Sequence, residues 1–348
     1  MKKISLVLAV VIMTALAASA ELSQSVVATL THGSTITTFA GGNALRDAHE
    51  AAVDGDAIVL SPGTFNAVDI TKAVTLRGAG AAALSLPDLP VAAGASTYIT
   101  GNMSINIEST SHSFNIEGCQ FSGQVTFNKA PSTSVFKSRF NRIRKISNGV
   151  ASINFTHCSV DFSEDAQTDD LCQNISMLNT YAKYLRFNPY TKATNCLLEY
   201  SNYYSQDCFS WGVNLPADGL LNNCIIFINH DKNFSTYSLS ANCTAYNCVA
   251  VTRSNLDYIK NFFENSSNGT NKTASASNVL ANMDWPFFLT EEAQTTYLGN
   301  DGTQVGIHGG PLPMDPIPDN LLVTSCNIAS KTTADGKLSV EIKVSTAK

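Results

Sequence analysis

Carboxylates are concentrated in one stretch of the chain, SVDFSEDAQTDDLC. This stretch contains Asp161, Glu164, Asp165, Asp169 and Asp170. Clustered carboxylates are ligands for Ca²⁺, and a carboxylate pair can perform the acid–base chemistry of glycoside hydrolysis. A solvated acidic loop is the alternative interpretation. We keep Ca²⁺ at the Asp161–Asp170 segment as a hypothesis, assign no metal ligand, and leave the catalytic residues unknown.

Basic residues flank this acidic stretch on both sides. A Lys or Arg can abstract a proton next to a carboxylate, and neighbouring cations can neutralise that carboxylate. Surface cations bonded to nearby acids are the alternative. Lys183 and Arg186 follow the acidic stretch, and we predict that they contact carbohydrate. The preceding basic residues are Lys137, Arg139, Arg142, Arg144 and Lys145.

Aromatic residues are dense between positions 181 and 211. An aromatic ring stacks well on the C–H-rich side of a sugar, whereas the rim of the sugar needs polar partners. Tyr203, Tyr204 and Trp211 fall in a long interval between two repeats, where an insertion would form a loop that carries binding. We therefore predict that these three residues contact carbohydrate. The alternative is that the aromatic side chains cover the core.

A repeat of about 20 residues must position these groups. Small residues recur at intervals of 19, 20, 19 and 19 residues, and then of 28 and 24, at Cys119, Ser138, Cys158, Met177, Cys196, Cys224 and Cys248. Such a period is typical of a solenoid, in which equivalent residues of successive coils stack. Cys acts as a compact apolar residue in such a stack, so we expect the thiols to be buried and reduced. Zinc binding and a disulfide are the alternatives.

Short alternating segments support a β-solenoid. Apolar and polar residues alternate at 105–107, 114–116, 125–127 and 153–155, which is typical of short strands. Strands of successive coils would then lie about 4.8 Å apart. Asn195, Asn223 and Asn247 each precede a repeat Cys, and we expect them at a bend, because Asn tolerates a left-handed backbone.

The N-terminal part of the repeat region begins with a helix pattern. GNALRDAHEAAV (42–53) predicts a short helix with Asn43 as its N-cap and with Leu45, Ala48, Ala52 and Val53 facing inward. Near the other end, we expect Asp284–Phe288 to plug the solenoid and His308 to have a structural role.

The run ALRDAHEAAVDGDAIVLSPGTF, followed by ITKAVTLRGAG, resembles the entry segment of the pectin lyase-like superfamily. The matching positions are Gly55, Asp56, Ile58, Leu60, Pro62, Gly63, Phe65, Leu76, Gly78 and Gly80. The segment Asp301–Gly310 resembles a terminal motif of uncharacterised secreted bacterial β-helix-repeat proteins. The resemblance implies an all-β fold, a right-handed single-stranded parallel β-helix over 21–310 with an N-terminal helical cap. Residues 311–348 then form a proline-rich linker and a C-terminal β-hairpin appendage.

The resemblance implies a protein that binds polysaccharide, and any cleavage would follow lyase or glycoside hydrolase chemistry. The Arg-x-Pro-x-x-Arg pattern of pectate lyases is absent from the sequence. Asp169 and Asp170 are adjacent, as in polygalacturonase-like hydrolases, but the other motifs of that family are missing. Whether the protein is an enzyme is therefore left open. The alternative is a non-enzymatic adhesion or scaffold protein of the cell surface or periplasm.

Residues 1–20 read as a signal peptide, with Lys2 and Lys3 before an apolar run and Ala18-Ser19-Ala20 at its end. We therefore expect a bacterial protein that is secreted, periplasmic or on the cell surface, with a polysaccharide or surface glycan as its partner. The chain has 22 basic and 28 acidic residues and a net charge of −6, which argues against nucleic acid. No second apolar run is long enough to span a membrane. The oligomeric state is left open.

Overall fold

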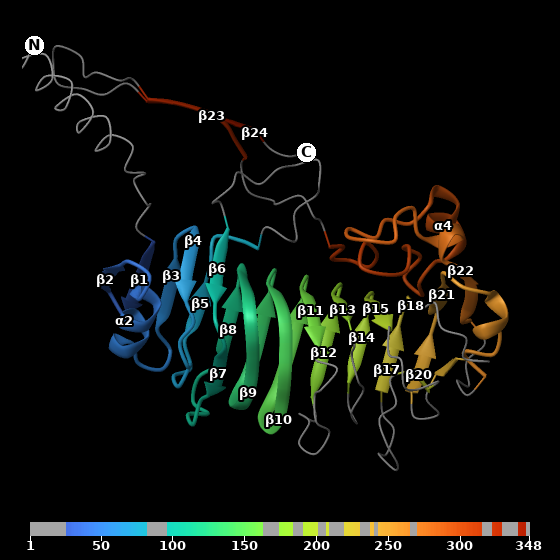
Figure 1. Ribbon diagram of the computed structural model, residues 1–348, viewed down its shortest axis with the longest axis horizontal. Helices are drawn as coiled ribbons and strands as arrows, with labels where there is room; N and C mark the ends of the chain where they lie inside the picture. Colours follow the sequence, from blue (N-terminus) through green and yellow to red (C-terminus); the bar gives the residue numbers. More distant parts are fainter. Residues whose placement is uncertain are drawn as a thin grey trace, which may run out of the picture.

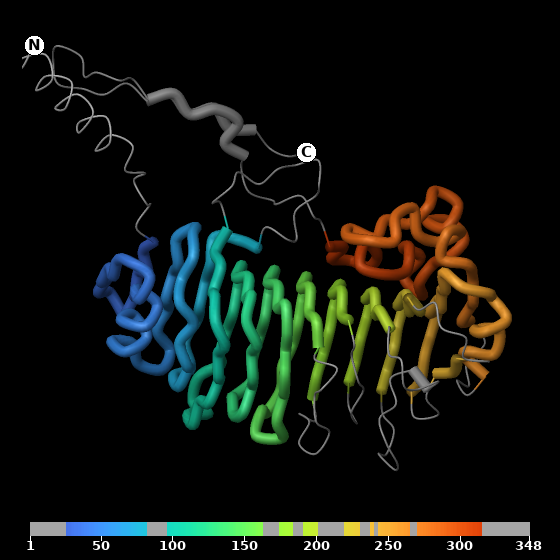
Figure 2. Tube along the Cα trace, in the orientation of Figure 1, coloured from blue at the N-terminus to red at the C-terminus, as the bar shows by residue number. Residues whose placement is uncertain are grey.

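The protein forms an elongated parallel β-solenoid (Figures 1 and 2). The computed structural model describes 26–81, 96–162, 174–183, 191–200, 219–229, 237–239, 243–264 and 270–314, together with the backbone of 207–208, 322–328 and 340–345. The prediction of an all-β parallel solenoid is confirmed. No helix among the described residues is long and apolar enough to cross a membrane.

Each coil contributes one strand to each of two parallel sheets and bends sharply between them. We call these sheets the pre-bend sheet and the post-bend sheet. In the pre-bend sheet the strands pair in parallel in this order: β3 (Ala57–Leu60), β5 (Thr75–Arg77), β8 (Phe114–Glu117), the ends of β9 (Cys119–Phe136) and β10 (Arg139–Thr156), β12 (Ile175–Leu178), β14 (Lys192–Thr194), β17 (Gly219–Asn222) and β20 (Cys243–Tyr246).

The post-bend sheet is also parallel. Its order is β4 (Gly63–Asn66), β6 (Thr97–Thr100), the starts of β9 and β10, β11 (Ser159–Phe162), β13 (Tyr181–Lys183), β15 (Leu197–Tyr200), β18 (Ile225–Ile228), β21 (Val249–Thr252) and β22 (Lys272–Ser275). A third side is formed by β7 (Met103–Asn106) with the middle of β9 and β10. Two short strands, β16 (Asp207–Cys208) and β19 (Ser238–Leu239), pair with each other.

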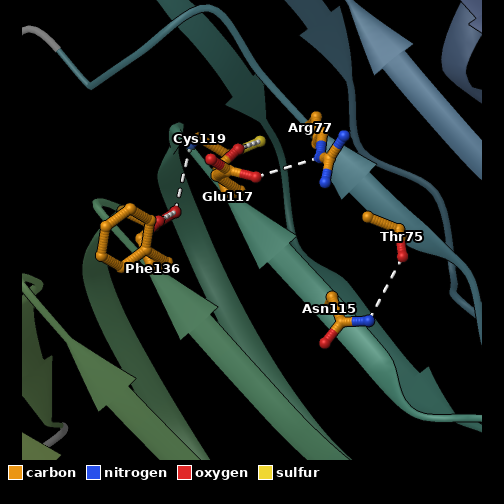
Figure 3. Close-up of polar contacts among 7 residues, drawn as sticks. Thr75, Arg77, Asn115, Glu117, Cys119 and Phe136 are labelled. Carbon is orange, nitrogen blue, oxygen red and sulfur yellow. Dashed lines mark hydrogen bonds and ion pairs between the residues drawn. The ribbon is translucent and has the colours of Figure 1, made fainter.

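Polar cross-strand pairs stabilise the early coils of the pre-bend sheet, and Figure 3 shows how they lie. Arg77 Nε donates to Glu117 Oε2 at 3.0 Å, and Asn115 Nδ2 donates to Thr75 Oγ1 at 3.2 Å. Residues on neighbouring strands that share a face interact in this way in any sheet. Outward side chains of these coils are thus bonded to their own cross-strand neighbours at these two places.

The bend is a column of left-handed residues. Their φ angles lie between 44° and 63°, at Gly118, Lys137, His157, Asn179, Asn195, Asn223 and Asn247. The predicted bend positions of the three Asn residues that precede a repeat Cys are confirmed. Asn179 was not predicted at a bend, because the sequence spacing assigned the repeat position of that coil to Met177 and not to Thr180.

The residue after each bend points into the core. Cys119, Cys158, Cys196, Cys224 and Cys248 are all buried there, and their thiols are free, as predicted. The hydroxyl residues of the same column bond the strand of the coil before them. Ser138 Oγ accepts from Cys119 N at 3.2 Å, and Thr180 Oγ1 accepts from Cys158 N at 3.3 Å.

Placing Met177 in this column was wrong. Ser159 pairs with Tyr181, so Thr180 lies opposite Cys158, whereas Met177 pairs with Phe155 in the pre-bend sheet. The coil from Cys158 to Thr180 is 22 residues long and the next is 16, and their sum equals two regular intervals of 19. The sequence spacing therefore looked regular where two unequal coils compensate.

The N-terminal end carries an antiparallel hairpin and a helix. β1 (Val27–His32) pairs with β2 (Thr35–Ala40) and with β3. The predicted helix is α2 (Ala44–Ala51), which contacts β1 to β4 and buries Leu45 and Ala48. Asn43 holds the N-cap position, but its side chain makes no capping bond and accepts from Asn66 Nδ2 instead.

The inward placement of Val53 was wrong, because this side chain is 48% exposed. The helix ends at Ala51, its C-cap residue Ala52 is extended, and the N–H of Val53 donates to Asp56 Oδ2 at 2.8 Å. That bond turns the backbone so that the Val53 side chain points outward.

A non-repetitive segment, residues 276–314, lies on the post-bend sheet. We call it the covering segment, and it contains α3 (Ala276–Val279) and α4 (Glu291–Thr296). It follows a short 3₁₀ helix, η3 (Leu256–Tyr258), and β22. Further along the chain, β23 (Leu322–Ile328) and β24 (Val340–Ser345) pair antiparallel.

The covering segment encloses a second apolar core, separate from the one inside the solenoid. The sheet contributes outward side chains, and the segment contributes Val279, Leu280, Phe287, Leu289, Val305 and Ile307. The prediction that Asp284–Phe288 plugs the solenoid end was wrong. Phe287 contacts Tyr181 of β13, with ring centroids 4.9 Å apart, so this loop covers a flank of the solenoid.

Candidate functional site

The candidate site lies on the outward face of the post-bend sheet, where the covering segment stops. Two columns of outward residues run along this face. Register places Tyr98, Gln120, Arg139, Ser159, Tyr181, Leu197, Ile225 and Val249 in the first column. The second column, two residues later on each strand, contains Asp161, Lys183, Glu199, Phe227 and Val251. Both columns change from polar to apolar between β13 and β18.

Four consecutive coils present alternating charges at this change. We call Arg139, Asp161, Lys183 and Glu199 the charge ladder. Asp161 pairs with Lys183 in register, and Lys183 pairs with Glu199. Neighbouring strands are about 4.8 Å apart, so Asp161, Lys183 and Glu199 alternate in sign along the second column. Arg139 stands opposite Ser159 in the first column and attracts Asp161 diagonally. The two carboxylates are two strand spacings apart, about 9.6 Å between backbones.

Glu199 is the most enclosed member of the ladder. It is 4% exposed, and both carboxylate oxygens have partners. Tyr181 donates its O–H to Oε2, Asn229 Nδ2 donates to Oε1 at 2.8 Å, and Lys183 Nζ lies 3.4 Å from Oε1. A buried carboxylate is stable only when such partners are present. Glu199 therefore holds Tyr181 and Lys183 in place.

Burial shifts the titration of two neighbouring groups. The pKa of Asp161 is raised, because burial outweighs the attraction of Arg139 and Lys183. Burial and the Glu199 carboxylate raise the pKa of Tyr181 far above its ordinary range. Tyr181 therefore remains a hydrogen-bond donor at any physiological pH, and Asp161 keeps a proton to a higher pH than an exposed aspartate does.

Aromatic rings border the ladder on the side of the covering segment. Tyr181 packs against Phe287, and Phe287 meets Trp285 edge-to-face at 6.5 Å. Trp285 is half-buried. Arg253 lies over the ring of Phe227 at 5.3 Å and donates to the carbonyl oxygen of Met283 at 3.1 Å. We call the charge ladder the floor of the site, and the rings of Tyr181, Phe287 and Trp285 its aromatic wall.

The column of bend residues holds the covering segment in position. Asn179 Nδ2 donates to the carbonyl oxygens of Ile307 and Gly309 at 2.9 and 2.7 Å. Asn223 exchanges hydrogen bonds with Asn300, and Asn223 Nδ2 also donates to Asn195 Oδ1 at 3.2 Å. The bend thus performs two tasks, since it turns each coil and binds the backbone of the covering segment.

Glycines allow this close contact. A Cβ on Gly310 would lie 2.2 Å from Asn195 Nδ2, and one on Gly306 would lie 2.6 Å from Ile225 Cδ1. Both glycines have positive φ angles, 80° and 85°. The terminal motif Asp301–Gly310 is therefore a docking device.

His308 has the structural role that was predicted for it. Its Nδ1 lies 2.9 Å from the carbonyl oxygen of Met314, and its Nε2 lies 2.8 Å from that of Pro286. Its ring also stacks on Phe288, with centroids 4.7 Å apart. These contacts join two parts of the covering segment.

The structure brings together two of the groups that the sequence suggested. Lys183 and Asp161 are neighbours, and Arg139 of the basic group belongs to the same ladder. Arg142, Arg144 and Lys145 lie further along β10, around Ile143, which pairs with Phe162 at the end of β11. The remaining candidates lie outside the described residues, namely Arg186, Tyr203, Tyr204, Trp211, Glu164, Asp165, Asp169 and Asp170.

Sequence reasoning missed Glu199 and Trp285. Glu199 stands in the apolar run CLLEY, and a lone charge in such a run indicates a buried polar contact. The contact between Glu199 and Lys183 depends on the register between β13 and β15. That register could not be found while Met177 was assigned to the repeat position. Within the parts of the chain that are described, no group of three or more His, Cys, Asp or Glu side chains is placed to hold a metal ion. The Ca²⁺ hypothesis involves undescribed carboxylates and stays a prediction.

Comparison of the chain with protein-family models, curated proteins and solved structures finds no match.

Proposed function

We propose that this protein binds polysaccharide along the outward face of its post-bend sheet, at the charge ladder. The observation that carries the proposal is the aromatic wall beside a row of buried and half-buried charges. Sugars are bound by such pairs of surfaces, because one side of the ring is apolar and its rim needs hydrogen bonds. The repeating floor suits a repeating ligand, since each coil adds a similar polar position.

Within the ladder, Lys183 and Asp161 are the proposed contact residues. Lys183 is 28% exposed at its side chain, whereas Glu199 is 4% exposed and already has three partners. Lys183 is held by its ion pair with Glu199, and the exposed part of its side chain can meet a sugar hydroxyl or carboxylate. The predicted contacts Tyr203, Tyr204, Trp211 and Arg186 stay part of the proposal.

Cleavage is a separate step of the proposal, and it depends on Asp161. A carboxylic acid with a raised pKa can protonate the leaving oxygen in glycoside hydrolysis. The matching base would have to activate water on the opposite side of the sugar. Glu199 does not suit that task, because its oxygens are occupied. The geometry therefore supports binding better than it supports hydrolysis.

The wider assignment belongs to the same proposal. We infer a right-handed β-helix of the pectin lyase-like kind, with α2 as its N-terminal cap and the residues after 310 as a linker and hairpin appendage. We also infer that residues 1–20 direct export of the chain, so that it meets glycans outside the cytoplasm. The entry motif around Gly55–Phe65 and the parallel register support the first of these inferences.

A panel of acidic and neutral polysaccharides tests the proposal in gel retardation. We expect at least one polymer to retard the protein, and Lys183→Gln to weaken that retardation about tenfold. Lys129→Gln is the matched control, since Lys129 is also paired with a glutamate but lies on the middle of β9. Lys183→Arg keeps the charge and should bind. Absence of retardation across the panel, or equal loss in both Gln variants, contradicts the proposal.

Product formation on the retained polymer tests cleavage. New reducing ends would indicate hydrolysis, and absorbance of an unsaturated bond would indicate a lyase. Asp161→Asn should abolish the activity while retardation persists. If no product forms although the polymer is bound, the protein is a binding protein and the cleavage step of the proposal is wrong.

A non-enzymatic scaffold is the second candidate function. The observation that favours it is the charge balance of the ladder, in which every charge has an opposite neighbour. Charges paired in this way can have a purely structural role, in which they stabilise the stacked coils and bind no ligand. A scaffold would show no retardation in the panel, and Lys183→Gln would then lower stability without any other effect.

A further inference from the structure

Among the described residues, the outermost strand at the N-terminal end of the solenoid has one unpaired edge. β2 pairs only with β1 in the described part of the chain, from Val27↔Ala40 to His32↔Thr35. Pairs along an antiparallel ladder alternate, so every second residue of β2 turns its N–H and C=O away from β1. Thr35 to Thr38 are all exposed. A row of backbone donors and acceptors therefore faces solvent.

In the described part of the chain, β2 itself lacks charged side chains, proline and bulges, which are features by which proteins usually prevent strand pairing. The helix α2 contacts β2, but Thr35 to Thr38 stay exposed beside it. The stretch from Gly33 to Leu45 contains no charged residue and no proline. The β1–β2 register is continuous over six pairs. Ile36, on the same strand, is 68% exposed.

We propose that two copies of this chain associate through antiparallel pairing of their β2 strands. The strand is uncharged, so two copies approach without repulsion, and it offers no charge that would select a charged partner. Antiparallel pairing about a two-fold axis is self-complementary, because the same groups face each other on both strands. The β-branched and aromatic residues of TITTFA favour the extended conformation that pairing needs.

The side-chain alternation limits the register of this pairing. Directly opposed residues in a sheet point to the same face. Ile36, Thr38 and Ala40 share one face of β2, so in a pairing centred on the strand Thr38 lies opposite Thr38, Ile36 or Ala40 of the second copy. In each of these registers, position 38 is close to the two-fold axis. A charge placed there would meet its own copy.

The size of the contact predicts a weak dimer. One six-residue strand pair buries much less than the roughly 1,200 Å² of a stable interface. We therefore expect a dimer that dissociates on dilution and depends little on ionic strength, since no charges take part. The dimer would be a rod of about twice the monomer length. This proposal does not depend on polysaccharide binding.

Sedimentation equilibrium of the full chain over a concentration series tests the proposal. We expect monomer–dimer exchange for the natural chain, and at least a tenfold weaker association for Thr38→Lys and for Thr38→Glu alone. An equimolar mixture of these two variants should dimerise again, because opposite charges then meet at the axis. Rescue by mixing also shows that both variants are folded.

Ser134→Lys is the matched control. Ser134 is exposed on β9 but lies between β8 and β10, so no free edge is changed, and its association should equal that of the natural chain. A monomer at about 1 mM natural chain overturns the proposal. Equal loss of association in Thr38→Lys and Ser134→Lys, or no rescue in the mixture, overturns it as well.

Discussion

The outward face of the post-bend sheet differs between its early and late coils, although the inward face is alike throughout. In the early coils this face carries Thr64, Tyr98 and Gln120, which are exposed or half-buried. In the late coils the same column carries Leu197, Ile225 and Val249, which are fully buried under the covering segment. The same backbone thus supports a surface in one region and a second core in the other.

The difference explains why late strands lack the usual alternation. β15, β18 and β21 are buried at every residue, because one face meets the solenoid interior and the other meets the covering segment. Parallel strands covered on both faces read as continuous apolar runs. The charge ladder lies at the border, where one neighbour is water and the other is apolar. That position produces the burial of Glu199 and the raised pKa of Asp161.

The largest expected effect comes from truncating the second core. Ile225→Ala should lower the free energy of unfolding by about 2–5 kcal/mol, because it leaves a cavity under Gly306. Thr64→Ala, in the same column of an early coil, should change it by about 0.5 kcal/mol or less. Denaturant unfolding of both variants measures the difference. Equal costs would mean that the late face is not a core.

The docking of the covering segment can be broken at a glycine. Alanine at a positive φ costs about 1–2 kcal/mol by itself, and Gly310→Ala adds a clash with Asn195. Gly302 also has a positive φ, 76°, but no atom lies within 4 Å of an added Cβ. Gly302→Ala should therefore show the backbone cost alone, and Gly310→Ala should be at least 1 kcal/mol worse in the same unfolding assay. If the two variants are equally stable, Asn195 does not contact the segment.

The border between the regions can be tested with tyrosines of one column. Tyr181→Phe removes the donor to the buried Glu199 carboxylate and should cost about 1.5–3 kcal/mol. Tyr98 lies four strands before Tyr181 in the same column. Tyr98→Phe loses no hydrogen bond that is present among the described residues, and its cost should be close to zero. Thermal unfolding at neutral pH compares the two. A Tyr181→Phe variant as stable as Tyr98→Phe would show that Glu199 is satisfied without the phenol.

The smallest effect near neutral pH concerns the inner face, where both regions should behave alike. Burial raises the pKa of Cys119 in an early coil and of Cys158 in a middle coil to about 12. Above pH 9 the unfolded thiols lose protons while the folded ones keep them, so stability falls as pH rises from about 9 towards 12.

Each such thiol should contribute about 1 kcal/mol of this loss over the first pH unit above 9. Unfolding measured from pH 8 to 10 for the natural chain and for Cys119→Ser and Cys158→Ser checks the slope. A steeper slope in one variant than in the other would show that the inner face is not uniform. Fast labelling of either thiol in the native protein would contradict its burial.

The repeat, the strands and the bend could be predicted from the sequence because they depend on local patterns. Cys119, Cys158 and Asn223 recur with the same neighbours, so their column follows from spacing. Spacing could not show that Thr180, and not Met177, belongs to this column. The coils before and after Thr180 differ in length by six residues, and their combined length equals that of two regular coils.

The site itself was predictable only in part. Lys183 and Asp161 were recognised by type, whereas their contact depends on the register between β11 and β13. Glu199 joins the site through the register between β13 and β15, whereas Trp285 becomes its neighbour only when the covering segment folds back over the late coils. The folding back of the covering segment depends on contacts between residues that are far apart in the sequence. The glycines that allow these contacts are indistinguishable in sequence from ordinary turn glycines.

Amide hydrogen exchange of the native chain, with and without the polysaccharide retained in the panel, tests the central claim most directly. Without ligand, we expect slow exchange in the late strands β15, β18 and β21 and in residues 305–310 of the covering segment. With ligand, additional protection should be confined to 159–162, 181–183 and the loop that carries Trp285. Protection on β7 or on the middle of β9 instead, or none with any polymer, would contradict the claim that the border of the two regions is the binding site.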